Sequence, residues 1–159
     1  GINIDLNPLT IELFNYLRPR DININSAISD DEKKKNLYFI DDLNTQNTLE
    51  KNHIDFLKKY HSIKDDEIKV MQVDTKKLNN VLKQHNFKKV DFLNIDIEGH
   101  EINVLNSIDF NTYSFRAICI EMISHNDLSE KHNEKIKKIL QEKNYHLLKK
   151  ISYNYIYVK

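Results

Sequence analysis

The chain has 159 residues, 40% hydrophobic and 30% charged, and its 24 basic residues balance its 24 acidic ones. This length fits one domain, residues 1–159, that can bury a core, and zero net charge disfavours a nucleic-acid partner. No apolar run approaches the roughly 18–20 residues of a membrane span, and no signal peptide is expected. The single cysteine, Cys119, lies among apolar residues and predicts a buried thiol. We therefore expect a protein of the reducing cytoplasm.

Apolar and turn-forming residues divide the first half of the chain into short elements. The predicted strands are residues 1–6, 22–28, 37–40 and 68–73. Pro8 opens a helix, and its inward face is expected to comprise Leu9, Leu13, Phe14 and Leu17. A second helix is indicated around residues 54–57. A third is capped by Asp74 or Thr75 and runs to about Gln84.

The second half of the chain gives the clearer pattern. Its predicted strands are residues 90–95, 116–122, 145–151 and 153–158. A helix carrying Ile102 and Leu105 follows the first of these, and an amphipathic helix spans residues 128–143. The last two strands form a hairpin. Alternating strands and helices followed by a hairpin predict one α/β sheet, mostly parallel with an antiparallel edge.

Acidic residues stand at the carboxyl ends of three predicted parallel strands, where α/β sheets bind ligands. Asp5 can accept hydrogen bonds from a ribose diol, or it can simply cap the helix that follows. Asp96 and Glu98, with His100, suit a cation or a general base, but acids before a helix are equally good caps. Glu121 interrupts an apolar strand and needs a partner or solvent for its charge.

The histidines show no zinc-ligand spacing, and one cysteine excludes a Cys-rich zinc site. His125 and His132 are expected at the surface. No arrangement typical of a serine or cysteine nucleophile is indicated by spacing.

The stretch from Val90 to Leu105 resembles the signature of FkbM-type methyltransferases, which use S-adenosylmethionine. In that family an apolar strand leads into Asp-x-Glu-Gly-x-Glu and then Val-Leu. Here Asn94 stands where the family more often has lysine. Weaker similarities follow the family's order along nearly the whole chain, at residues 1–8, 17–29, 73–78, 117–121 and 154–158.

The resemblance implies a class I methyltransferase fold, a Rossmann-like sheet with an antiparallel hairpin at one edge. It implies methyl transfer from S-adenosylmethionine to a hydroxyl of a sugar, glycan or similar small molecule. By this resemblance Asp5 binds the cofactor's ribose, and the backbone around Ala27 and Ile28 lies beside the adenine.

The resemblance also implies that Asp96 and Glu98 face the sulfonium and the acceptor. Glu98 or His100 is then the candidate base, while Asp96 positions the acceptor or favours the positive sulfonium. Hard oxygen ligands suit Mg²⁺, but a divalent cation is not predicted. Whether the protein forms a homo-oligomer is left open.

The chain departs from the family in its glycines. The family's enzymes begin with a strand and a glycine-containing loop that carries the methionine part of the cofactor, but here the only glycines are Gly1 and Gly99. That first strand lies in the middle of the implied sheet. We therefore expect an N-terminal segment to be missing from this sequence. Strands 1–6 and 90–95 should then not be hydrogen-bonded neighbours, and should stand about 10 Å apart.

Two other functions stay open. One is a non-catalytic methyltransferase-like domain retained for binding or assembly, which the missing loop favours. The other is a nicotinamide-dependent sugar oxidoreductase, which would also need a glycine fingerprint.

Overall fold

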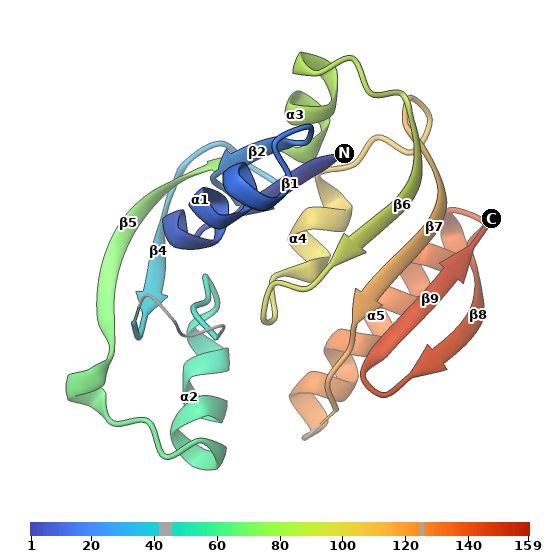
Figure 1. Cartoon of the computed structure of the whole chain (residues 1–159). Helices are drawn as coiled ribbons and strands as arrows, with labels where there is room; N and C mark the ends of the chain where they lie inside the picture. Colours follow the sequence, from blue (N-terminus) through green and yellow to red (C-terminus); the bar gives the residue numbers. More distant parts are fainter. Residues whose placement is uncertain (42–45, 125) are drawn as a thin grey trace.

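A computed structural model describes residues 1–41, 46–124 and 126–159 (Figure 1). The described strands are, in chain order, β1 (Ile2–Asp5), β2 (Ile22–Asn25), β3 (Ala27–Ile28), β4 (Lys34–Phe39), β5 (Lys69–Lys76), β6 (Lys89–Ile95), β7 (Ser114–Glu121), β8 (His146–Ile151) and β9 (Asn154–Val158). The described helices are α1 (Pro8–Leu17), α2 (Lys51–Tyr60), the 3₁₀ turn η1 (Asp65–Glu67), α3 (Leu78–Gln84), α4 (Glu101–Asn106) and α5 (Asp127–Glu142). This is a mixed α/β protein, consistent with a methyltransferase-like fold.

The described strands form three sheets, so the prediction of one sheet is wrong. β1 pairs in parallel with β2, and β5 lies between β3 and β4. The third sheet has the order β6-β7-β9-β8, with β6 and β7 parallel and the β8–β9 hairpin antiparallel at its edge, as predicted. Within the described residues β1 pairs only with β2 and β6 only with β7, which confirms that β1 and β6 are not hydrogen-bonded neighbours.

The predicted strand at residues 22–28 is broken at Ser26. The Ser26 N–H still donates to the Asp5 carbonyl, and the Asn25 side chain donates to the carbonyls of Asp5 and Leu6. These bonds end the β1–β2 ladder where β1 turns toward α1. Ala27 and Ile28 then pair with β5 instead.

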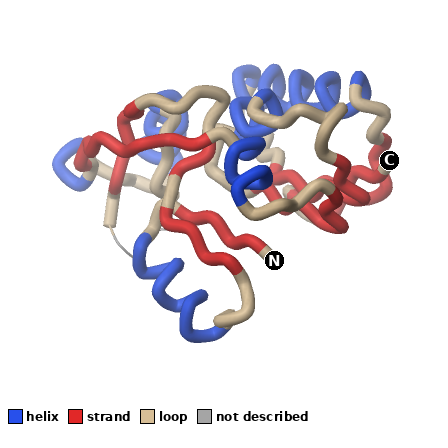
Figure 2. The backbone as a smooth tube through the Cα atoms, turned by 90° about the horizontal axis from the view of Figure 1, so that it is seen from above, coloured by secondary structure: helices blue, strands red, loops and turns tan. Residues whose placement is uncertain are grey.

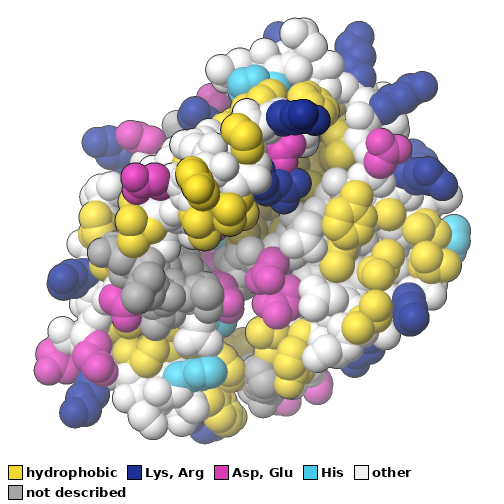
Figure 3. Space-filling view, in the orientation of Figure 1, with side chains coloured by type: hydrophobic (Ala, Val, Ile, Leu, Met, Phe, Trp, Pro, Cys, Tyr) yellow, Lys and Arg dark blue, Asp and Glu magenta, His cyan; other side chains and the backbone are white. Residues whose placement is uncertain are grey.

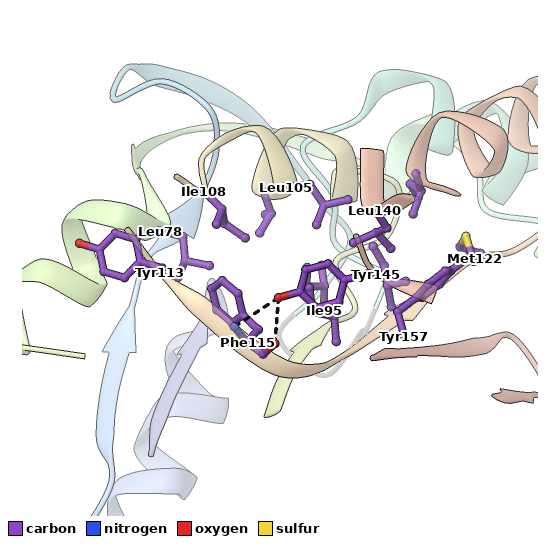
Figure 4. Close-up of a cluster of buried hydrophobic side chains, with 14 of the residues drawn as sticks. Leu78, Ile95, Leu105, Ile108, Tyr113, Phe115, Met122, Leu140, Tyr145 and Tyr157 are labelled. Atoms are coloured by element: carbon purple, nitrogen blue, oxygen red, sulfur yellow. Dashed lines mark hydrogen bonds between the residues drawn. The ribbon is translucent and has the colours of Figure 1, made fainter. Parts of the chain in front are cut away.

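The main core lies between α4, α5 and one face of the β6-β7-β9-β8 sheet (Figure 4). Ile95 and Phe115 from the sheet pack with Leu105 from α4 and Leu140 from α5. Each such side chain contributes about 1.5–3 kcal/mol when it is fully buried. The buried Tyr145 hydroxyl donates to the Phe115 carbonyl at 2.8 Å and accepts from the Phe115 N–H at 3.3 Å. These two bonds fix the start of the hairpin against β7.

Strand β1 shares this core although it is not paired with β6. Ile2 and Ile4 pack against the same hydrophobic cluster. Figure 2, seen from above, shows the β1–β2 pair beside the β6–β7 pair without joining it. The carboxyl ends of β1 and β6 therefore come together on one side of the molecule.

Two details of the helices differ from the sequence prediction. In α1 the buried residue is Ile11, whereas Leu13 is 53% exposed and Leu9 and Leu17 are also exposed, because the small β1–β2 sheet covers only one side of the helix. Thr75 does not cap α3. It lies in β5, where its buried hydroxyl donates to the carbonyl of Asp31 at 2.7 Å.

The remaining predictions about α2, α5 and the lone cysteine hold. α2 and α5 form where the periodicity indicated them, and Cys119 is buried. Among the described helices, none combines the length and apolar composition needed to cross a bilayer.

Candidate functional site

Two cavities lie at the carboxyl ends of the parallel strands. The smaller one, of about 150 Å³, is lined by every residue predicted for the site, namely Asp5, Ala27, Ile28, Asp96, Glu98 and His100. The structure thus brings together residues from three separate parts of the chain. Figure 3, in the orientation of Figure 1, shows acidic side chains gathered in a hollow near the middle of the molecule.

The larger cavity, of about 330 Å³, lies between α2 and α5. His53 and Phe56 line it from α2, Leu128 lines it from α5, and Glu121 comes from the end of β7. Among the described residues, Glu98 is the one that lines both cavities. A group bound in either cavity would therefore meet the same carboxylate.

Asp5 is not the cap of the first helix. Asn7 caps α1, because its side chain accepts from the Leu9 N–H at 2.9 Å. Asp5 instead accepts from the Asn7 N–H at 2.7 Å, and its partial burial raises the pKa of its carboxyl. The sequence left open whether Asp5 caps the helix or binds a ligand. Asn7 is the cap, so the first explanation does not apply to Asp5.

The turn after β6 has an unusual backbone. Glu98 has φ of 54° and Gly99 has φ of 101°, both in the left-handed region that side-chain-bearing residues disfavour. α4 begins only at Glu101, with His100 at the cap position and no side-chain cap. The Glu101 carboxylate reaches back to accept from the Gly99 N–H at 3.0 Å. Asp96 and Glu98 therefore do not cap this helix.

Three carboxylates meet at the ends of β6 and β7. Ligand oxygens of Asp96, Glu98 and Glu121 all lie within 4.8 Å of one another, and Asp96 and Glu121 are hydrogen-bonded. Partial burial, then the negative charges of Asp96 and Glu98, raise the pKa of Glu121 to about 8. Partial burial and the Glu98 charge also raise the pKa of Asp96, although that side chain is open to the cavity. The pair therefore retains a proton at neutral pH.

This carboxylate pair accounts for Glu121, the acidic residue that interrupted an apolar strand in the sequence. The register of β6 and β7 places it directly beside Asp96, since Ile95 pairs with Ile120. The three acidic side chains also offer the hard oxygen ligands that a divalent cation prefers.

His100 makes its side-chain hydrogen bonds with two other residues. It is 3% exposed, and its Nδ1 lies 2.5 Å from Glu50 Oε1 while its Nε2 lies 3.0 Å from Ser29 Oγ. Both ring nitrogens are thus engaged, and the hydrogen bond from His100 lowers the pKa of Glu50. Ser29 is fully buried, so this Ser-His-Glu chain cannot present a nucleophile to a substrate. It holds the turn instead.

Two further histidines lie at the site and were not predicted from the sequence. His53 Nε2 lies 3.2 Å from Glu98 Oε2, and His132 Nε2 lies 2.9 Å from the buried Glu101 Oε2. His132 is therefore half-buried and paired, which corrects the prediction that it is simply a surface residue. His125 lies outside the described residues. The one signal in the sequence is the helical periodicity of α2 and α5, which places these side chains near the inward face.

Parallel strands whose carboxyl ends place acidic side chains around one cavity are the usual ligand-binding arrangement of an α/β protein. Comparison with known families goes further. The family model described as the Methyltransferase FkbM domain matches residues 1–147. The chain belongs to the FkbM methyltransferase family, which confirms the resemblance seen at residues 90–105. No curated protein and no solved structure matches the chain.

Proposed function

We propose that this protein is an S-adenosylmethionine-dependent O-methyltransferase acting on a hydroxyl of a sugar, a glycan or a similar small molecule. The observation that carries the proposal is the position of Glu98 at the boundary of two cavities. The smaller cavity is lined by the residues expected to bind the cofactor. The other is lined by polar and aromatic side chains that suit a hydroxylated acceptor.

The residues of the smaller cavity fit a nucleoside. Asp5 would accept hydrogen bonds from the ribose diol, each worth about 1.5–3 kcal/mol because the acceptor is charged. Ala27 and Ile28 present backbone and small apolar surface for the adenine. The negative charge around Asp96 would favour a positive sulfonium. When bound, S-adenosylmethionine supplies a methyl group on a sulfonium that is already a good leaving group.

The smaller cavity is also incomplete for such a ligand. Its volume of about 150 Å³ falls below the roughly 300–1,000 Å³ of most small-molecule pockets. Among the described residues, β1 and β6 each pair with a strand on one side only. We place a further parallel strand between them, followed by the glycine-containing loop that would hold the methionine end. This strand would join the β1–β2 sheet to the β6-β7-β9-β8 sheet in a Rossmann-like class I arrangement.

Glu98 is our candidate for the base that removes the acceptor's proton. It faces both cavities, whereas His100 has no free ring nitrogen and Asp96 shares a proton with Glu121. A positioned general base contributes about 10²–10⁴ in rate. Alignment of the acceptor hydroxyl by the cavity walls would supply much of the remainder. His100 then positions the turn, and Asp96 orients the acceptor or the sulfonium.

A second candidate is a non-catalytic methyltransferase-like binding or assembly domain. The lack of a glycine-rich loop in these 159 residues favours it. The assembly of Asp5 and the whole Asp96–Glu101 turn around one cavity favours the enzyme.

Calorimetric titration of the native full-length protein with S-adenosylmethionine, and separately with NAD, tests the proposal. We expect the first ligand to bind and the second not to. Binding of NAD alone would favour a nicotinamide-dependent oxidoreductase, and binding of neither would favour the non-catalytic domain.

A further inference from the structure

The segment at residues 48–53 contacts the turn at residues 98–100 three times. The Thr48 hydroxyl donates to the Glu98 carbonyl at 2.7 Å. Glu50 Oε1 lies 2.5 Å from His100 Nδ1, and His53 Nε2 lies 3.2 Å from Glu98 Oε2. One short stretch of chain thus reaches both the backbone and the side chain of Glu98, from about fifty residues away in the sequence.

The segment is itself firmly held. Thr48 exchanges two backbone hydrogen bonds with Tyr38 of β4, at 2.8 and 3.1 Å. Its buried hydroxyl also accepts from the Glu50 N–H at 3.0 Å. Ile54 and Leu57, on the following turns of α2, are buried and fix the helix against the protein. The contacts to the turn therefore come from a rigid support.

The turn needs such support. Left-handed backbone at a residue with a side chain is strained and persists only where the surroundings enforce it. Glu98 has this conformation, and the next residue, Gly99, lies against Glu50 and His53. The segment at residues 48–53 therefore contacts both residues that have this left-handed backbone.

His53 has a particular place in this arrangement. Its Nε2 atom is buried and has no regular hydrogen-bond partner among the described residues, and Glu98 Oε2 lies 3.2 Å from it. Its ring also lines the larger cavity. Without His53, the Glu98 side chain would be free to turn toward other neighbours or solvent.

We propose that residues 48–53 are the positioning element of the catalytic turn, and that His53 is the residue that holds the Glu98 carboxylate at the boundary of the two cavities. The proposal rests on the proposed function in so far as Glu98 acts as the base. His53 is a positioning residue, since its effect on the reaction passes through Glu98. Neither its position in the sequence nor the family signature indicates this role.

The first test is structural. Crystal structures of the native full-length protein would be compared for the wild type, His53→Ala, His53→Gln and His61→Ala. Gln keeps a donor at the end of the side chain, and His61 ends the same helix at an exposed position. We expect Glu98 to leave its place or to adopt several rotamers only in His53→Ala. An unchanged Glu98 in His53→Ala would overturn the proposal.

The second test is kinetic, with S-adenosylmethionine and the methyl glycosides of glucose, galactose, mannose and rhamnose as probes. We expect His53→Ala to lower kcat by about 10- to 100-fold, because a small misplacement of a reacting group has this effect. KM and cofactor affinity should change less than about twofold, and His53→Gln should recover much of kcat. An equal loss in His61→Ala or a change confined to KM would overturn the proposal. If the wild type methylates no probe, the proposed function loses support while the crystal structures still decide the positioning role.

Discussion

The side chains of Asp96 and Glu121 are hydrogen-bonded to each other at the ends of two adjacent parallel strands. Two carboxyl groups this close cannot both be ionised without repulsion, so one proton stays between them. Glu98 stands beside the pair and adds a further negative charge. The site therefore contains a carboxyl that is protonated at neutral pH next to a candidate base.

The proton on Glu121 predicts that the protein loses stability as pH rises. Its pKa in the folded protein is about 8, above the ordinary value of 4.5, so the folded state holds a proton that the unfolded state releases. Stability should therefore fall between about pH 4.5 and 8 and then level off, by less than the full pKa shift would give because solvent screens this partly exposed group. Glu121→Gln, which resembles the protonated side chain, should remove this part of the pH dependence. Urea unfolding at pH 5 and at pH 8.5 gives the free energy of unfolding of both proteins. An equal change between the two pH values in the wild type and in Glu121→Gln would count against the shared proton.

Asp5→Ala should weaken binding of S-adenosylmethionine by about ten- to a hundredfold, because it removes the charged acceptor of the ribose hydroxyls. Asp91→Ala is a matched control, since Asp91 is exposed on β6 and lines neither cavity. Equilibrium dialysis with labelled cofactor gives both affinities. If the two variants bind equally well, Asp5 does not hold the ribose.

Gly99→Ala should destabilise the protein by about 1–2 kcal/mol. A Cβ at this position would have ordinary contacts, the nearest at 3.6 Å from Glu50 Cγ, so the cost comes from the backbone at φ of 101°. Glu98→Gly should instead stabilise the protein, since glycine relieves the strain at φ of 54°. Denaturant midpoints of the two variants check both expectations. A neutral Gly99→Ala would show that the turn readily adopts another conformation.

The sequence predicted the local features of this structure better than its long-range pairing. Periodicity located β6, β7, α5 and the terminal hairpin, and the spacing of Asp96, Glu98 and Gly99 identified the acidic turn. The lack of pairing between β1 and β6 was predicted, but the separate β3-β5-β4 sheet was not, because which strand edges meet depends on contacts between distant segments. For the same reason the sequence showed Glu121 as an isolated carboxylate, although its partner lies on the next strand.

The contacts that support the turn could not be predicted from the sequence either. His53 and Glu50 lie in a polar stretch without a motif, and only the fold brings them to Glu98 and His100. His100 shows the reverse case. Its place in the signature suggested a base, whereas the structure engages both of its ring nitrogens inside the protein.

The central claim is that Glu98 is the base of a methyl transfer from S-adenosylmethionine to a hydroxyl. It is tested most directly by measuring cofactor affinity and turnover together, with methyl glycosides as acceptors, for the native full-length protein and its Glu98→Gln and Asp96→Asn variants. Glutamine keeps the shape of Glu98 and loses the proton acceptor. We predict that Glu98→Gln binds the cofactor as the wild type does but transfers methyl groups about 10²–10⁴ times more slowly. Normal turnover in Glu98→Gln with none in Asp96→Asn would assign the base to Asp96, and full activity in both variants would contradict a catalytic role for either carboxylate.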